Sequence, residues 1–205
     1  MGYSFAVMTA DTAFRSDEEF TQREFRRWVQ QRPRTDINHY ELIQGRIVMT
    51  PPAGQAHARV EIRLARSIEE YVEQHDAGVA FGSSAGYDLP SGDTLEPDVS
   101  YISAQRWAAG PKSGPDEFLR MVPNLVIEVL SRSTAKRDLT EKKAIYERNG
   151  VNEYWIVDPR RNAVTVFHLG EEGFDAGIIF KSGAVRSRVL PKLHVRIEKL
   201  FEPIA

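Results

Sequence analysis

The amino-acid sequence predicts an α/β protein in which helices flank a mixed β-sheet and further β-hairpins are added. Three observations indicate this fold class. Residues 124–130 form a run of branched apolar residues, the pattern of a central strand that is covered on both faces. A helical pattern that ends at Gly150 and a strand pattern at 153–159 follow, as in a crossover between two parallel strands. Turn residues at 44–45 and 160–162 each join two strand-like runs.

The first third of the chain alternates helix and strand patterns. "SDEEFTQREFRRWVQQ" (16–31) predicts a helix with a Ser cap and apolar residues at helical spacing. "YELIQGRIVMTP" (40–51) predicts a hairpin that turns at Gln44-Gly45. Apolar residues at helical spacing predict a second helix over 56–75.

The middle of the chain changes to the strand period. We expect strands at 79–90 and 97–102 on either side of a turn at 91–94. A Gly- and Pro-rich connection then covers residues 103–123 and is expected to hold a short helix at 115–120.

The helix after the central strand is expected to begin at Asp138, because Asp138 and Glu141 fit a capping box, and to run through Asn149. The remaining strand-like segments are 153–159, 163–169, 176–181 and 184–189.

The composition excludes several classes of protein. The 205 residues, 41% of them hydrophobic, suit one domain, which we expect over residues 17–205 after an N-terminal extension over residues 1–16. The absence of cysteine excludes disulfides, thiolate catalysis and zinc–thiolate sites. No membrane span or signal peptide is evident, so a cytoplasmic protein is expected. Exposed edge strands in the C-terminal half favour a homodimer.

Glu128 is the one acid within the apolar run of the central strand. A buried carboxylate without a partner costs several kcal/mol, and it is normally compensated by a cation, a metal ion or a raised pKa. Asp98 follows Pro97 at the start of another predicted strand, where it is either a solvated strand-end acid or a second inward carboxylate. Two carboxylates within a few ångströms repel each other unless a cation lies between them.

Lys142 lies on the inward face of the helix that follows Glu128. With about 100° per residue, Lys142 falls at about 300°, the direction shared by Leu139, Ile145 and Tyr146. A lysine there needs a carboxylate partner. Oxygen donors of two acids favour Mg²⁺ or Mn²⁺, and a nearby lysine would orient or deprotonate a water molecule at the ion.

Several motifs, in order, resemble the Uma2 family of endonucleases. They are "HYELIQGRIVM", "PPAGQAHARV", "PDVSYI", "PNLVIEVLS" and "DLTEKKAIYERNGVNEYWIVDP". This family is similar to the PD-(D/E)XK nuclease superfamily, and the resemblance, over about residues 17–170, implies a restriction-endonuclease-like fold.

The resemblance also implies site residues. Asp98 and Glu128 match the metal-binding acids, and the backbone carbonyl of Val129 would be a third ligand. Leu130 stands where the superfamily has its lysine, and Lys142 matches the lysine that the Uma2-like pattern has on the next helix.

Two further residues match family positions. Glu41 matches an acid of the family, or is an exposed strand residue or a partner of Arg46 or Arg59. His57 is either a loop or capping residue or, at a helix N-terminus, a donor to phosphate or a residue that positions water.

The sequence therefore predicts an endonuclease that hydrolyses DNA phosphodiester bonds with Mg²⁺ or Mn²⁺. Arg132, Lys136 and Arg137 form a basic cluster that either contacts the nucleic-acid backbone or is a solvated loop. The alternative is a catalytically weak or inactive module that binds nucleic acid, favoured by the displaced lysine. A third interpretation is a structural ion pair between Glu128 and Lys142. An enzyme predicts Asp98 and Glu128 carboxylates open to solvent, whereas a structural pair predicts a closed, dry contact.

Overall fold

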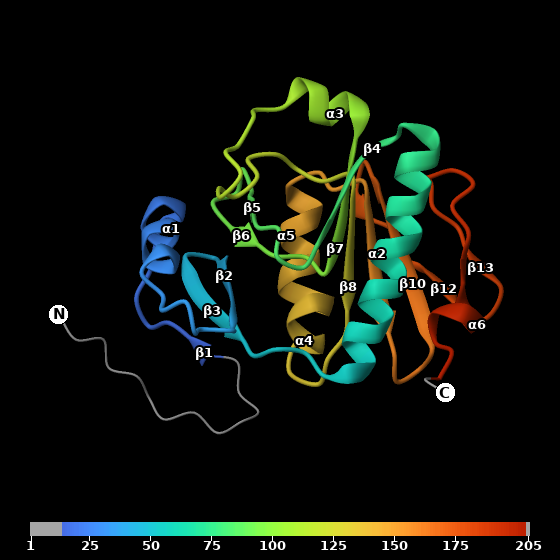
Figure 1. Ribbon diagram of the computed structural model, residues 1–205, viewed down its shortest axis with the longest axis horizontal. Helices are drawn as coiled ribbons and strands as arrows, with labels where there is room; N and C mark the ends of the chain where they lie inside the picture. The colour runs from blue at the N-terminus through green and yellow to red at the C-terminus, as the bar shows by residue number, and fades with distance from the viewer. Residues whose placement is uncertain (1–13, 204–205) are drawn as a thin grey trace.

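Two β-sheets and the helices around them make up the computed structural model, which describes residues 14–203 (Figure 1). The larger sheet has the strand order β11-β10-β9-β8-β7-β4, and β12 also pairs with β10. Its strands are β4 (Gly78–Gly82), β7 (Val99–Ser103), β8 (Leu125–Val129), β9 (Glu153–Asp158), β10 (Ala163–Gly170), β11 (Gly173–Phe174) and β12 (Ile178–Phe180). Parallel and antiparallel pairs both occur, and helices flank the sheet, so the predicted α/β class is confirmed.

The predicted central strand is β8, and all of its residues are buried. It pairs antiparallel with β7 and parallel with β9, with Ile127 opposite Trp155. Between β8 and β9 the chain passes through one helical segment, made of α4 (Ala135–Arg137), η1 (Asp138–Lys142) and α5 (Lys143–Arg148). The predicted crossover between parallel strands is therefore confirmed.

Alternate residues of β8 face two different helices. The odd-numbered residues belong to the apolar cluster that contains the buried side chains of α2 (Gln55–His75). Val126 belongs to the other large cluster, with Ile145 of α5. Because successive side chains of a strand point to opposite faces, Glu128 shares the α5 face with Val126. The alternation of side chains along β8 thus determines the face on which Glu128 lies.

The second sheet has the order β1-β3-β2-β6-β5 and stands beside the main sheet, next to α1 (Figure 1). The elements of this part are β1 (Phe14–Arg15), α1 (Gln22–Gln30), β2 (His39–Ile43), β3 (Arg46–Thr50), β5 (Tyr87–Asp88) and β6 (Thr94–Leu95). The predicted hairpin is confirmed, because Gln44 and Gly45 adopt the left-handed conformation, with φ of 51° and 74°, between β2 and β3. This hairpin carries Glu41, whose side chain is buried.

The first helix begins at Gln22 rather than at residue 16. Thr21 caps it, because its side chain accepts a hydrogen bond from the N–H of Glu24 while the Glu24 carboxylate accepts one from the N–H of Thr21. The Ser16 hydroxyl instead accepts a hydrogen bond from the N–H of Ile47, beside β3. The capping box of Thr21 and Glu24 therefore begins the helix, in place of the predicted Ser16 cap.

The predicted strand 79–90 is divided between the two sheets. Its first part is β4, paired with β7, and its last part contains β5, paired with β6. The predicted turn at 91–94 contributes Thr94 to β6. The helix predicted at 115–120 does not form. A helix forms instead at the start of the connection, α3 (Ala104–Ala109), where the Ser103 hydroxyl accepts a hydrogen bond from the N–H of Arg106.

Asp138 is not the predicted N-cap, because α4 precedes it and its own backbone is helical. η1 is a π-helical turn, which is wider than an α-helical turn and therefore changes the angular step between residues. Leu139, predicted to face inward, is 45% exposed, whereas Lys142 is buried as predicted. The predicted inward direction was therefore right for Lys142 but wrong for Leu139, the residue from which the helical angles were counted.

The C-terminal part adds short elements to this framework. The predicted strand 176–181 corresponds to β12. The predicted strand 184–189 is limited to β13 (Ala184–Val185), which pairs with β14 (Val195–Arg196), and α6 (Ile197–Leu200) follows. Within residues 14–203, no helix has the length and apolar character needed to cross a membrane.

The N-terminal segment is described in part. Residues 1–13 of the predicted extension lie outside the described residues. Phe14 and Arg15 form β1, which pairs with β3. The second sheet thus includes residues that precede the expected boundary at residue 17.

Gly78→Ala is predicted to destabilise the fold by more than about 3 kcal/mol. Gly78 has φ of +140°, and a Cβ atom there would lie 2.1 Å from the carbonyl oxygen of Ile102. The matched control is Gly82→Ala on the same strand, where a Cβ atom meets nothing within 4 Å. Urea unfolding of both variants measures the difference, and equal midpoints would contradict this account of the junction between α2 and β4.

Candidate active site

A cavity of about 430 Å³ lies between the two sheets and receives side chains from both. Glu41 comes from β2, His57 and Glu61 from α2, and Asp98 from the residue before β7. Glu128 and Val129 of β8 and Lys142 of η1 also line it. All the residues that the sequence singles out for catalysis or metal binding therefore meet at one cavity.

Lys142 forms the closest ionic contacts in this cavity. Its Nζ atom lies 2.5 Å from Oε1 of Glu128 and 2.8 Å from Oε1 of Glu41. The side chains of all three residues are at most 5% exposed. The phenolic hydroxyl of Tyr146 also donates a hydrogen bond to Oε1 of Glu128, at 2.8 Å. On this side of the cavity the ion pairs are closed and almost inaccessible to solvent.

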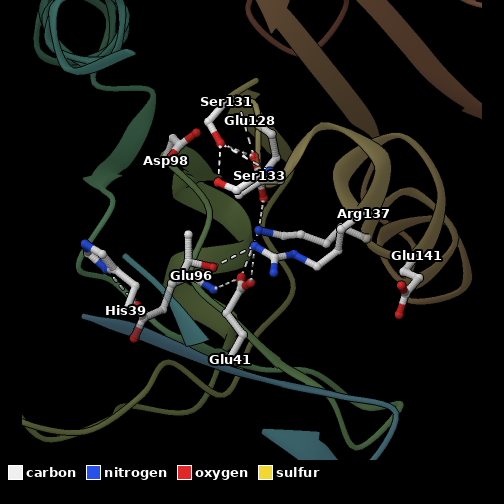
Figure 2. Close-up of polar contacts among 12 residues, drawn as sticks. His39, Glu41, Glu96, Asp98, Glu128, Ser131, Ser133, Arg137 and Glu141 are labelled. Atoms are coloured by element: carbon white, nitrogen blue, oxygen red, sulfur yellow. Dashed lines mark hydrogen bonds and ion pairs between the residues drawn. The ribbon is translucent and has the colours of Figure 1, made fainter. Parts of the chain in front are cut away.

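Glu41 connects the second sheet to this contact. Its Oε1 atom accepts a hydrogen bond from the N–H of Glu96, at 2.9 Å, and its Oε2 atom lies 3.9 Å from Nη2 of Arg137. Figure 2 shows Glu41 and Arg137 directed toward one another below Glu128, while the carboxylate of Glu96 points toward His39. Glu41 is therefore neither an exposed strand residue nor a partner of Arg46 or Arg59, and its cationic partners are Lys142 and Arg137.

The charges of this group follow from burial and proximity. Burial opposes charge on Lys142, but Glu128 and Glu41 together keep its pKa above the ordinary value, so the ammonium persists. Burial also opposes charge on Glu41, yet Lys142 and Arg137 hold its pKa below the usual range. For Glu128, burial outweighs the attraction of Lys142 and raises the pKa well above its ordinary value. One ammonium thus faces two carboxyl groups, of which Glu128 is the easier to protonate.

Asp98 and His57 form the other side of the cavity. Oδ2 of Asp98 accepts a hydrogen bond from the N–H of Val129, at 2.6 Å, and Oδ1 lies 3.2 Å from Nε2 of His57. Burial raises the pKa of Asp98 to about 7, and burial lowers the pKa of His57. Neither ring nitrogen of His57 has a hydrogen-bond partner among the described residues, although both are buried.

The expected metal ligands fit this geometry in part. Asp98 and the backbone of Val129 lie together, but Oε1 of Glu128 is taken by Lys142 and Tyr146. Within residues 14–203, the group of three donors close enough to share an ion is His57, Glu61 and Asp98, whose ligand atoms lie within 4.8 Å of one another. The sequence analysis missed Glu61. Its position four residues after His57 on a predicted helix, which places both on one face, is the signal that would have identified it.

The predicted basic residues lie beside the cavity. Arg132 and Arg137 line it, and Lys136 is exposed on α4. In the loop after β8, the hydroxyl of Ser131 lies 3.1 Å from that of Ser133 (Figure 2) and 3.0 Å from that of Thr134.

Comparison with known proteins gives a family and a fold. A family model described as "Uma2: Putative restriction endonuclease" matches residues 18–196. A crystal structure of a "putative nuclease" from Anabaena variabilis is similar, with a TM-score of 0.70 and 21% identity over 89% of this chain and 97% of that chain. No curated protein matches. At this level of identity the structural likeness shows a shared fold, and it confirms the predicted nuclease-like architecture.

Asp98→Asn is predicted to stabilise the metal-free protein at pH 8, by up to about 4 kcal/mol, because the buried carboxylate is charged there at a cost. The pKa of Asp98 is raised in the fold to about 7 from an ordinary value of 3.8. Its cost is therefore absent below about pH 4, grows between about pH 4 and pH 7, and is complete above pH 7. Thermal unfolding at pH 8 and pH 4.5 measures the effect, and an equal gain at both pH values would contradict it.

Lys142→Met is predicted to destabilise the protein by about 3–5 kcal/mol at pH 7, because it leaves Glu41 and Glu128 buried without their shared cation. The exposed Lys136 supplies a matched control, Lys136→Met, which should stay within about 0.5 kcal/mol of wild type. Adding Glu41→Gln and Glu128→Gln to Lys142→Met should restore much of the loss. Chemical denaturation measures each free energy, and a loss of under 1 kcal/mol in Lys142→Met would contradict the assignment.

Proposed function

Because the chain belongs to the Uma2 family, we propose that it is a metal-dependent endonuclease that hydrolyses phosphodiester bonds of DNA. The observation that carries this proposal is the meeting of Asp98, Glu128 and Lys142, which come from three separate elements, at one cavity. Carboxylates that hold a divalent cation beside a lysine suit phosphodiester hydrolysis, because negative charge develops on the phosphate as water attacks.

Each residue has a distinct part in this reaction. A divalent cation, Mg²⁺ or Mn²⁺, would stabilise the developing charge when bound, with Asp98 as a ligand and Glu128 and the Val129 carbonyl as the further ligands that the family resemblance implies. Lys142 keeps its proton, because two carboxyl groups raise its pKa, so it orients water or phosphate as a hydrogen-bond donor.

Arg132 and Arg137 support a nucleic-acid substrate, because both line the cavity and guanidinium groups bind phosphate oxygens. Lys136 lies next to Arg137 in sequence and is exposed. These cations offer a local positive surface in a chain whose net charge is −2. A homodimer, which would suit cleavage of two strands, and a cytoplasmic location stay predictions from the sequence.

One observation favours a second function, that of a nuclease-fold module that binds nucleic acid without cleaving it. The 2.5 Å contact between Lys142 and Glu128 is closed, and Leu130 occupies the place of the usual lysine. A site kept in this state would retain its cationic rim but lose hydrolysis. The two functions share the cavity and differ in turnover.

Incubation of the purified protein with supercoiled plasmid and Mg²⁺ or Mn²⁺ distinguishes these functions. We expect nicking and linearisation that require the metal and that fall at least about 100-fold in Asp98→Asn and Glu128→Gln, since each removes a charged group of the site. Asp116→Asn, in an exposed loop, is the control and should cleave normally.

Intact plasmid with either metal, together with a gel shift that Arg137→Gln weakens, would favour the binding module. Cleavage that persists in Asp98→Asn would contradict the site assignment.

A further inference from the structure

We propose that a groove next to the cavity holds one unpaired nucleobase of the nucleic acid, so that the protein selects strands with unpaired nucleotides over regular duplex. The inference rests on the proposed function for the class of its ligand, but it concerns binding, which is measurable without cleavage. It gives a substrate-selecting role to Phe81, Trp107 and Phe118, which line the groove and lie outside the cavity.

The groove adjoins the cavity. It has a volume of about 760 Å³, and Glu61 of α2 and Ser83 of the loop after β4 line both the cavity and the groove. Its other wall includes α3, which lies near β4 at one end of the main sheet (Figure 1). A strand with one phosphate in the cavity can therefore place a neighbouring base in the groove.

Aromatic side chains from three separate segments line the groove. They are Phe81 of β4, Trp107 of α3 and Phe118 of the connection that precedes β8. The ring centroids of Phe81 and Trp107 lie 5.9 Å apart, and their planes are tilted by 50°. Aromatic faces are the surfaces on which proteins stack the bases of single strands, because every base has a π-face.

The neighbouring structure holds these aromatic walls in position. The ring of Phe118 lies 6.0 Å from that of Phe25, and it packs so closely on Gly86 that a Cβ atom there would lie 2.5 Å from it. Nζ of Lys112 lies 4.7 Å from the centroid of the Trp107 ring and donates a hydrogen bond to the Trp107 carbonyl oxygen, at 2.6 Å. A base that enters the groove thus meets surfaces that are already ordered.

The charge of the groove indicates a base rather than a phosphate. Among the described residues that line the groove, the charged ones are all acids, whereas Arg132 and Arg137 line the cavity. Acids repel phosphate groups and arginines attract them. The backbone of a bound strand would therefore stay at the cavity while an uncharged ring enters the groove.

The base must be unpaired to reach these walls. In a regular duplex each base is stacked between its neighbours, and it has to leave the stack before another ring can pack on its face. Ile62 of α2 also lines the groove and is 58% exposed, so it offers apolar surface that a base would cover. The groove therefore fits single strands, and duplexes only where a nucleotide is unpaired.

Fluorescence anisotropy of a labelled oligonucleotide of about 12 nucleotides tests the groove, with Ca²⁺ in place of Mg²⁺ and the oligonucleotide verified intact on a gel. The single strand should bind at least about 10-fold more tightly than the blunt duplex of the same sequence. Trp107→Ala should weaken single-strand binding at least about 10-fold, because the base loses its stacking surface, whereas Trp107→Phe should stay within about 3-fold of wild type.

Ile179→Ala is the matched control, because Ile179 is an exposed apolar residue of β12 and lies outside the groove. It should bind both oligonucleotides as the wild type does. Circular dichroism of each variant verifies that it is folded.

Tryptophan fluorescence gives a second readout that a purely structural role of Trp107 would not change. Saturation with the single strand should quench the fluorescence of the wild-type protein, because a base stacks on Trp107. Trp107→Phe should bind the strand without this quenching, since the other two tryptophans, Trp28 and Trp155, are 9% and 0% exposed.

A single strand that binds no more tightly than the duplex, or wild-type affinity in Trp107→Ala, would overturn the proposal. Selective binding of the single strand through Trp107 without plasmid cleavage would uphold the groove and refute the endonuclease function. Metal-dependent plasmid cleavage, together with strand binding that Trp107→Ala does not weaken, would uphold the endonuclease function and refute the groove.

Discussion

The architecture depends on the buried ammonium of Lys142, which contacts Glu128 of the main sheet and Glu41 of the second sheet. Neither acid could be buried in this way without it, because an uncompensated charge in the interior costs several kcal/mol. The ammonium of Lys142 thus compensates one buried carboxylate from each sheet at the point where the two sheets meet. The contact holds the walls of the cavity in place, and the orientation of the second sheet is linked to the chemistry of the site.

The cavity has two electrostatically different sides, one at Glu128 and the other at Asp98 and His57. On the Glu128 side, lysine supplies the positive charge permanently. On the His57 side, two acids and an imidazole remain without such compensation within the described residues. Burial raises the pKa of Asp98 to about 7, against the opposing effects of the Val129 N–H and Lys142. A fold that tolerates such a cost keeps a place for a ligand, in the way that binding sites generally sacrifice stability.

The features that could be predicted from the sequence are those that a single physical rule determines. Apolar residues on both sides of Glu128 identified the central strand, because a strand buried on both faces needs a continuous apolar run. Burial of Lys142 was likewise predictable, since lysine on an apolar stripe needs a partner. Glu61 could not be selected before α2 and Asp98 were known to meet, because its partners are distant in the chain. The π-helical turn has no local signal, which explains the errors at Asp138 and Leu139.

The departure from the superfamily pattern at Leu130 has a geometric consequence. A lysine at position 130 would project from the same face of β8 as Glu128, since strand side chains repeat every two residues. From there it would serve the main sheet alone. Lys142 approaches from η1 instead, and therefore also contacts Glu41 on β2. Because the lysine is on the helical segment rather than on β8, its side chain contacts acids of both sheets. Asp98 instead faces His57, with its Oδ1 atom 3.2 Å from Nε2 of the imidazole.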